Sequence, residues 1–135
     1  MFRIWLGVAN TEKFDSINCF RNLGYSFWKM GNRRYCVGDV IYFYVSSEGR
    51  VMFKTRVVEI NLNQQTWDDD EYWSDAERAK AEGKMRMKIE LIGEYNGDEL
   101  DDERLRLYGM PERKSPIEQP VHKYTACIDY IQSKF

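Results

Sequence analysis

The sequence predicts an α+β fold built around a small, curved β-sheet or barrel. Three features carry this prediction: an apolar hairpin at residues 36–61, an opening with the element order β-α-β-β-β, and a helical stripe at the C-terminus. A hairpin with one strongly apolar face is not stable alone in water, so the rest of the chain must cover it. The 135 residues fit one domain, residues 1–135, long enough to bury about two-thirds of its unfolded surface.

The opening alternates strand and helix patterns. Residues 2–9 predict a buried strand with Trp5 in its middle. Asn10 is a candidate N-cap for a helix that Gly24 would end. Residues 25–30 then predict a short aromatic strand that leads toward the hairpin. The apolar stripe expected for the helix consists of Phe14, Ile17 and Phe20.

The hairpin is predicted from strict alternation on both sides of a turn. Residues 46–49 form the turn, in which Gly49 supplies the positive φ that such loops need. One face is expected to be buried, and the opposite face of the return strand is expected to be mainly basic and exposed. The expected inward residues are Ile41, Phe43, Val45, Val51, Phe53, Thr55 and Val57. The expected outward residues of the return strand are Arg50, Met52, Lys54 and Arg56.

The second half contains one further strand pattern and three helical patterns. Residues 74–77 form a capping box, and the helix after it has only alanines as an apolar face, so we expect an exposed insertion. Residues 84–92 alternate as a strand, with Met85, Met87, Ile89 and Leu91 on one side. Residues 98–107 predict a short helix, and residues 110–120, with three prolines, an extended connection. A stripe of Tyr124, Ile128, Ile131 and Phe135 predicts a C-terminal helix docked on the sheet.

Charge is distributed unevenly along the chain. The net charge is −2, but residues 1–58 carry +5, residues 59–103 carry −10 and the remainder carries +3. The overall balance argues against broad, unspecific binding to duplex nucleic acid, so any nucleic acid is expected on one basic face. There is no apolar run of membrane-helix length and no signal-peptide pattern at the start. Three cysteines without metal spacing indicate a reduced, cytoplasmic protein with small buried thiols.

The sequence offers little material for catalysis, and we expect a protein that is not an enzyme. His122 is the sole histidine, it follows a proline by two residues, and no nucleophile is predicted beside it. The acidic run at residues 68–71 lacks the spacing of a calcium loop, so we interpret it as a solvated loop. No phosphate-binding glycine loop or zinc pattern is present. We therefore expect no catalytic residues, no metal and no cofactor.

Aromatic residues are the strongest indication of a binding site. Trp28 precedes a Gly and two Arg at the mouth of the predicted sheet, and Trp67 and Trp73 lie in a polar loop after the hairpin. An aromatic wall from each segment would bind a flat ring, and base stacking contributes about 1–3 kcal/mol. The alternative is that these tryptophans pack the ends of a barrel, which is our interpretation of Trp5. The basic residues expected to contact phosphates are Lys29, Arg33, Arg34, Lys54 and Arg56.

The segments IWLGVANTEKF, YSFWKMGNRR, VGDVIYFYVSS and RVMFKTRVVE together resemble an EVE domain of the PUA-like superfamily. The resemblance covers residues 2–59 well and residues 84–92 loosely. It implies a PUA-like mixed β-barrel of about five to six strands with flanking helices. The family resembles YTH domains in shape, and both are associated with modified bases in RNA or DNA. By this resemblance Trp28 lines the pocket and residues 66–73 supply the opposite wall. The sequence departs from the family in its acidic stretch and from the related ASCH signature at residues 31–33.

These observations lead to one functional hypothesis with open alternatives. The leading hypothesis is a non-catalytic module that recognises a modified base in DNA or RNA through an aromatic cage. The alternatives are a module for a small planar metabolite and a protein-interaction module that uses the acidic loop; an RNA-processing enzyme is disfavoured. The base, the choice of DNA or RNA and the oligomeric state stay open. The candidate ligand-binding residues are Trp28, Trp67, Trp73, Asn10, Ser26 and Phe27.

Overall fold

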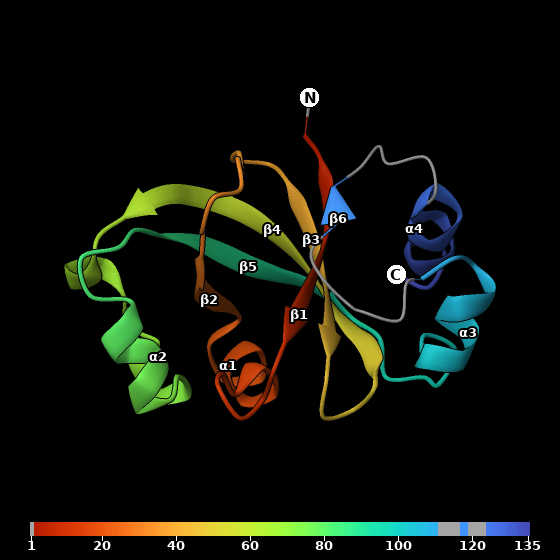
Figure 1. Cartoon of the computed structure of the whole chain (residues 1–135), viewed down its shortest axis with the longest axis horizontal. Helices are drawn as coiled ribbons and strands as arrows, with labels where there is room; N and C mark the ends of the chain where they lie inside the picture. Colours follow the sequence, from red (N-terminus) through yellow and green to blue (C-terminus); the bar gives the residue numbers. More distant parts are fainter. Residues whose placement is uncertain (1, 111–116, 119–123) are drawn as a thin grey trace.

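The computed structural model describes residues 2–110, 117–118 and 124–135. Within these ranges one mixed sheet has six strands in the order β2-β5-β4-β3-β1-β6. The strands are β1 (Ile4–Ala9), β2 (Tyr25–Lys29), β3 (Val40–Val45), β4 (Arg50–Leu62), β5 (Arg86–Glu94) and β6 (Ile117–Glu118). The sheet is strongly curled, with helices at its flanks (Figure 1), which confirms the predicted α+β class and strand number.

Three of the four α-helices in the described ranges lie at the two ends of the curled sheet, and the fourth lies between them. Figure 1 places α2 at one end, α3 and α4 at the other, and α1 between them. Their bounds are α1 (Ser16–Leu23), α2 (Asp75–Lys80), α3 (Asp102–Leu107) and α4 (Thr125–Gln132). Two 3₁₀ turns, η1 (Gln64–Thr66) and η2 (Asp70–Tyr72), precede α2. The segment between β4 and β5 therefore builds one whole end of the molecule.

The opening of the chain has the predicted order β1-α1-β2-β3-β4. β1 pairs in parallel with β3, while β3, β4, β5 and β2 pair antiparallel in turn. A parallel pair needs a crossover, and here α1 and β2 lie within it. Because β2 pairs with β5, the aromatic segment that the sequence placed near the hairpin lies beyond β5.

Two apolar clusters cover the two faces of the sheet. The first core cluster includes Trp5, Phe14, Phe20, Trp28, Ile41, Phe43, Phe53 and Trp73, and α1 closes it. The second core cluster includes Leu6, Tyr42, Tyr44, Val51, Leu105, Ile128 and Ile131, and α3 and α4 close it. Because both faces are covered, all six residues of β3 are buried. The predicted docking of the C-terminal helix on the sheet is confirmed.

A β-bulge changes the facing of the return strand. The pairing register of β3 and β4 shifts between Phe43 and Tyr44, so that Phe43 pairs with Phe53 but Tyr44 pairs with Val51. A bulge inserts one residue and reverses the alternation beyond it. Val51 is buried as predicted but belongs to the second core cluster, whereas Met52, predicted outward, is buried in the first. Arg56 is exposed as predicted, and Arg50 and Lys54 are half-buried.

The predicted N-cap of α1, Asn10, is wrong by five residues. The helix begins at Ser16, and the Asp15 carboxylate caps it by accepting from the Asn18 backbone N–H at 3.3 Å. Asn10 instead forms a separate turn, in which its side-chain oxygen accepts from the Glu12 N–H at 3.0 Å. The predicted stop is confirmed, because Gly24 has φ 77° and its N–H bonds to the Phe20 carbonyl.

Three further expectations are corrected by burial. Arg86, expected on the solvent side of its strand, is 1% exposed, while Met85 of the expected inward set is 50% exposed. Cys36 is exposed, in contrast to the buried Cys19 and Cys127, and all three thiols are free. The acidic run is not uniformly solvated, because Asp69 is fully buried. His122 and the three prolines at 111, 116 and 120 lie outside the described residues.

Candidate functional site

Two neighbouring cavities lie at the end of the molecule built by the segment between β4 and β5. The smaller one, about 230 Å³, is bounded by Asn10 after β1, Trp28 on β2 and Trp73 before α2. The larger one, about 740 Å³, is a basin bounded mainly by residues 29–33 and by α2 and the turn after it. Lys13, Lys29 and Glu77 border both cavities, so they form one continuous site.

Packed aromatic rings form the wall of the small cavity. Trp73 stacks on Phe14 with ring centroids 4.2 Å apart and an interplanar angle of 17°. Trp28 lies 5.7 Å from Trp73 at 44° and meets Phe43 edge to face at 4.8 Å. Trp28 and Trp73 thus contact each other and leave no gap for a ring between them. A planar ligand would pack against the wall that they share, with Asn10 beside it.

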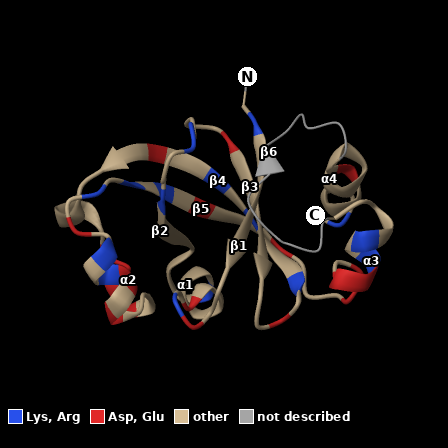
Figure 2. Cartoon of the chain, in the orientation of Figure 1, with Lys and Arg blue, Asp and Glu red and all other residues tan. Residues whose placement is uncertain are grey.

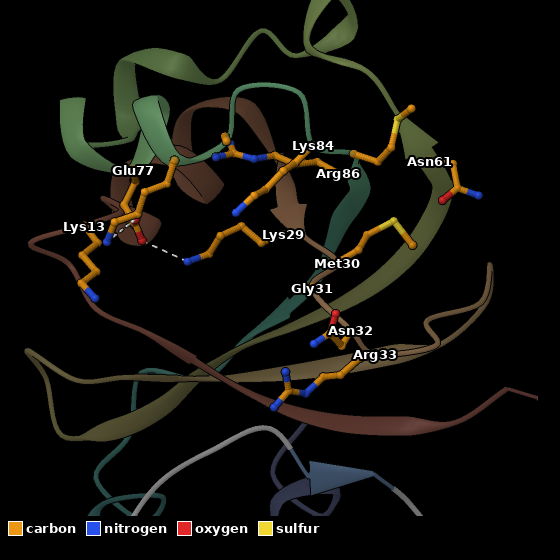
Figure 3. A pocket seen from close by; sticks show the side chains of 13 residues that line it. Lys13, Lys29, Met30, Gly31, Asn32, Arg33, Asn61, Glu77, Lys84 and Arg86 are labelled. Atoms are coloured by element: carbon orange, nitrogen blue, oxygen red, sulfur yellow. Dashed lines mark hydrogen bonds and ion pairs between the residues drawn. The ribbon is translucent and has the colours of Figure 1, made fainter.

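The basin is strongly basic. Its lining contains six basic residues, Lys13, Lys29, Arg33, Lys80, Lys84 and Arg86, and one carboxylate, Glu77 (Figure 3). The excess of positive charge favours anionic groups such as phosphates. Asn61, at the end of β4, also lines the basin and has φ 57°, a conformation that is uncommon outside glycine.

A buried carboxylate fixes the aromatic wall in place. One oxygen of Asp69, Oδ2, accepts from Ser26 Oγ at 2.9 Å, from the Phe27 N–H at 2.8 Å and from Trp73 Nε1 at 2.9 Å. The bonds from Ser26 and Phe27 join the loop before α2 to β2, and the third bond ties Trp73 to the same carboxylate within that loop. Asp69 therefore holds Trp73 against the strand that carries Trp28.

Trp67 takes a different position from the one expected. The guanidinium of Arg86 lies between two indole rings, 4.5 Å from the centroid of Trp67 and 4.2 Å from that of Trp73. Burial holds the pKa of Arg86 below its ordinary value, and the charges of Asp69, Asp70 and Glu77 oppose that shift. Because Arg86 fills the space beside Trp67, this tryptophan borders neither cavity. The wall opposite Asn10 comes from Trp73 and Trp28.

The remaining predicted residues are divided between the site and other surfaces. Ser26 and Phe27 are buried beneath the site, where they bind Asp69. Lys29 and Arg33 line the basin, while the neighbouring Arg34 is exposed and lines neither cavity. Lys54 lies over the ring of Tyr42 at 5.8 Å, and Arg56 pairs with Val40, so both face the second core cluster. The structure therefore separates Lys54 and Arg56 from the cavities.

Sequence reasoning missed Lys13, Glu77, Lys80, Lys84 and Arg86 as cavity residues. Glu77 and Lys80 lie on α2, which the sequence predicts to be an exposed insertion, and Arg86 lies on β5 at a position that the alternation assigns to solvent. A signal existed, because Glu77 and Ala81 are four residues apart and therefore share one helical face, and both are buried. The capping box itself is present, with Ser74 Oγ accepting from the Glu77 N–H at 3.3 Å.

In the described ranges, no group of three or more His, Cys, Asp or Glu side chains is placed to hold a metal ion. No helix in the same ranges has the length and apolar character needed to span a bilayer.

Comparisons with known proteins show the fold. No protein-family model matches the chain, and no curated protein matches it either. A hypothetical protein from Leishmania major has a similar structure, with a TM-score of 0.62, 18% identity, and coverage of 98% of this chain and 94% of that one. A protein from Pseudomonas syringae has a TM-score of 0.58 and 19% identity, covering 96% of this chain and 99% of that one.

A third similar structure is a complex with a ligand. It is the Pho92 YTH domain in complex with m6A, with a TM-score of 0.50, 15% identity, and coverage of 98% of this chain and 85% of that one. At these identities the likeness establishes a shared fold alone. The chain is thus similar in architecture to this YTH domain.

Proposed function

We propose that this protein is a non-catalytic module that recognises a modified base in single-stranded or locally opened nucleic acid. The base occupies the small cavity against Trp28 and Trp73, with Asn10 at its edge, and the adjoining phosphates lie over the basic basin. The finer assignment to the EVE group within the PUA-like fold belongs to the same proposal.

The observation that carries the proposal is the convergence of three distant segments on one cavity. Asn10, Trp28 and Trp73 come from the end of β1, from β2 and from the loop before α2. Aromatic rings supply a stacking surface for any base, while the amide of Asn10 can donate to or accept from a base edge. The Pho92 domain, which has the same fold, supports a modified base as the ligand class.

The basic basin favours nucleic acid over an isolated neutral metabolite. A free planar metabolite needs only the small cavity, whereas the basic residues of the basin other than the buried Arg86 suit several phosphates. Lys13 is exposed and Lys29 is half-exposed, so both remain available to a bound strand. A nucleic-acid ligand therefore uses both cavities.

Binding to short RNA and DNA strands with one central modified base tests this function. We expect tighter binding of at least one modified strand than of its unmodified counterpart. Trp28→Phe keeps a smaller aromatic ring, so it should remove part of the about 1–3 kcal/mol that base–aromatic stacking contributes and weaken this binding about three- to tenfold.

A matched control is Trp5→Phe. Trp5 belongs to the same core cluster and is 3% exposed, but it borders neither cavity. Its substitution should leave the affinity of the folded protein unchanged. Equal affinity for modified and unmodified strands, or equal losses in the two variants, would rule the proposal out.

A further inference from the structure

A buried carboxylate lies where the two cavities meet. Glu77 is 4% exposed and lines both the small cavity and the basin. Lys29 Nζ donates to its Oε1 at 3.0 Å, and Lys80 Nζ lies 3.6 Å from its Oε2 (Figure 3 shows the contact with Lys29). The same Lys29 nitrogen is 6.0 Å from the centroid of Trp73, so the ion pair sits at the rim of the aromatic wall.

The surroundings keep this carboxylate ionised. Burial alone would raise the pKa of Glu77, but the hydrogen bond from Lys29 and the charges of Lys29, Lys80 and Lys13 outweigh burial and lower it. A carboxylate has about four acceptor positions on its two oxygens. Lys29 uses Oε1, and Lys80 is beyond good hydrogen-bond distance from Oε2, so Glu77 has acceptor capacity left.

We infer that Glu77 determines ligand specificity by accepting an N–H of the base in the small cavity, while Lys29 donates to the acceptor atom beside it. The inference rests on the proposed function and names the ligand class: a neutral base that presents an N–H next to a ring nitrogen or carbonyl. A base whose N–H is replaced by a methyl group would leave an ionised, buried oxygen without its partner, which is costly. The six basic residues around the site also disfavour positively charged methylated bases.

Matched pairs of modified strands test this inference. Each pair differs in one N–H: N6-methyladenine against N6,N6-dimethyladenine, and N4-methylcytosine against N4,N4-dimethylcytosine. In the base class that binds, the wild-type protein should prefer the N–H member about tenfold or more, the usual effect of an unmade hydrogen bond to a charged group. Glu77→Ala should abolish that preference.

A second variant and a control complete the experiment. Glu77→Gln nearly preserves the shape but has a weaker acceptor, so the preference should decrease and the protein should stay folded. Glu82→Ala removes an exposed carboxylate that borders neither cavity, so the preference should be unchanged. A purely structural role of Glu77 would weaken binding of both members of a pair equally and leave their ratio intact.

The outcomes separate the two proposals. Equal binding of both members by the wild-type protein, or a preference that survives in both Glu77 variants, overturns the inference and leaves the proposed function standing. Failure of the wild-type protein to prefer any modified strand over the unmodified one overturns both.

Discussion

The two ends of the molecule differ in the kind of side chain that they bury. At the end that holds α3 and α4, the described members of the second core cluster are apolar residues and tyrosines. At the end that holds α2, three charged side chains, Asp69, Glu77 and Arg86, are at least nine-tenths buried. Figure 2 shows acidic and basic residues side by side on both α2 and α3, so the two ends differ in which charged side chains are buried.

This difference supports the α2 end as the location of the proposed site. Burying a charge costs free energy unless partners compensate, so charged residues are rarely buried for stability alone. The α2 end retains three of them around two cavities, whereas the α3 and α4 end achieves burial with apolar packing. We expect substitutions at the α2 end to alter both binding and stability, and substitutions at the other end to alter stability alone.

The largest expected effect is that of Asp69→Ala. The substitution removes the acceptor for Ser26, Phe27 and Trp73 and takes away negative charge near Arg86, so unfolding should become easier by about 3–5 kcal/mol. Urea denaturation measures this change. Asp68→Ala is the control, because its carboxylate is exposed and bonds only to the hydroxyl of Tyr25 among the described contacts. Similar losses for both variants would contradict the anchoring role of Asp69.

Ile131→Ala tests the apolar end. The side chain is 1% exposed within the second core cluster. Its truncation should destabilise the protein by about 2–5 kcal/mol, because apolar burial is lost and a cavity is left in the core. The affinity of the folded protein for a modified strand should not change. Leu107→Ala, at a residue that is 79% exposed, should alter stability by about 0.5 kcal/mol or less. A loss of affinity in the Ile131 variant would contradict the expectation that substitutions at this end alter stability alone.

Salt dependence sharpens the comparison for basic residues. Lys13 borders both cavities, whereas Arg56 faces the second core cluster. Lys13→Gln should reduce the slope of log affinity against log salt by about 0.7, the value for one single-strand phosphate contact. Arg56→Gln should leave the slope unchanged. A reduced slope for Arg56→Gln and an unchanged slope for Lys13→Gln would place the nucleic acid on the outer face of the hairpin, where the sequence alone predicts it.

The smallest expected effect is a pH dependence due to Glu77. Its pKa is lowered below the ordinary 4.5, so its contribution to stability is complete above that value and is lost as the pH falls through the lowered one. The wild-type protein should therefore lose stability in acid more steeply than Glu77→Gln does. Urea midpoints from neutral pH to about pH 2 measure this difference. Parallel pH profiles would show that the Lys29 ion pair does not stabilise the fold.

Local patterns were enough to predict the sheet but not the site. Alternation in the hairpin placed Ile41 and Phe43 on one face correctly, because successive side chains of a strand point to opposite faces of the sheet until a bulge interrupts the period. The stripe of Ile128 and Ile131 likewise predicted a docked helix. Trp28 and Asn10 were identified as site residues, and the cavity brings them together.

The polar half of the site depends on contacts between distant segments. Asp69 looks like one member of an exposed acidic run, and only its three donors from β2 and Trp73 account for its burial. Arg86 alternates as a solvent-facing residue, but two indole rings enclose it. The pattern of residues along one strand or loop does not reveal these contacts, because the contacting residues belong to other elements of the fold.

The segment at residues 63–85 starts and ends at one paired position of the sheet, where Leu62 lies opposite Arg86. It contributes Trp73 and Glu77 to the site, while the strands at its two ends are joined by their own antiparallel pairing. Replacing an insertion between two paired strands costs little closure entropy, even when its length changes. Proteins of this fold can therefore differ in this segment, and so in one wall of the cavity, while the paired strands stay the same. Grafting the corresponding segment of a relative onto this sheet should transfer that relative's ligand preference.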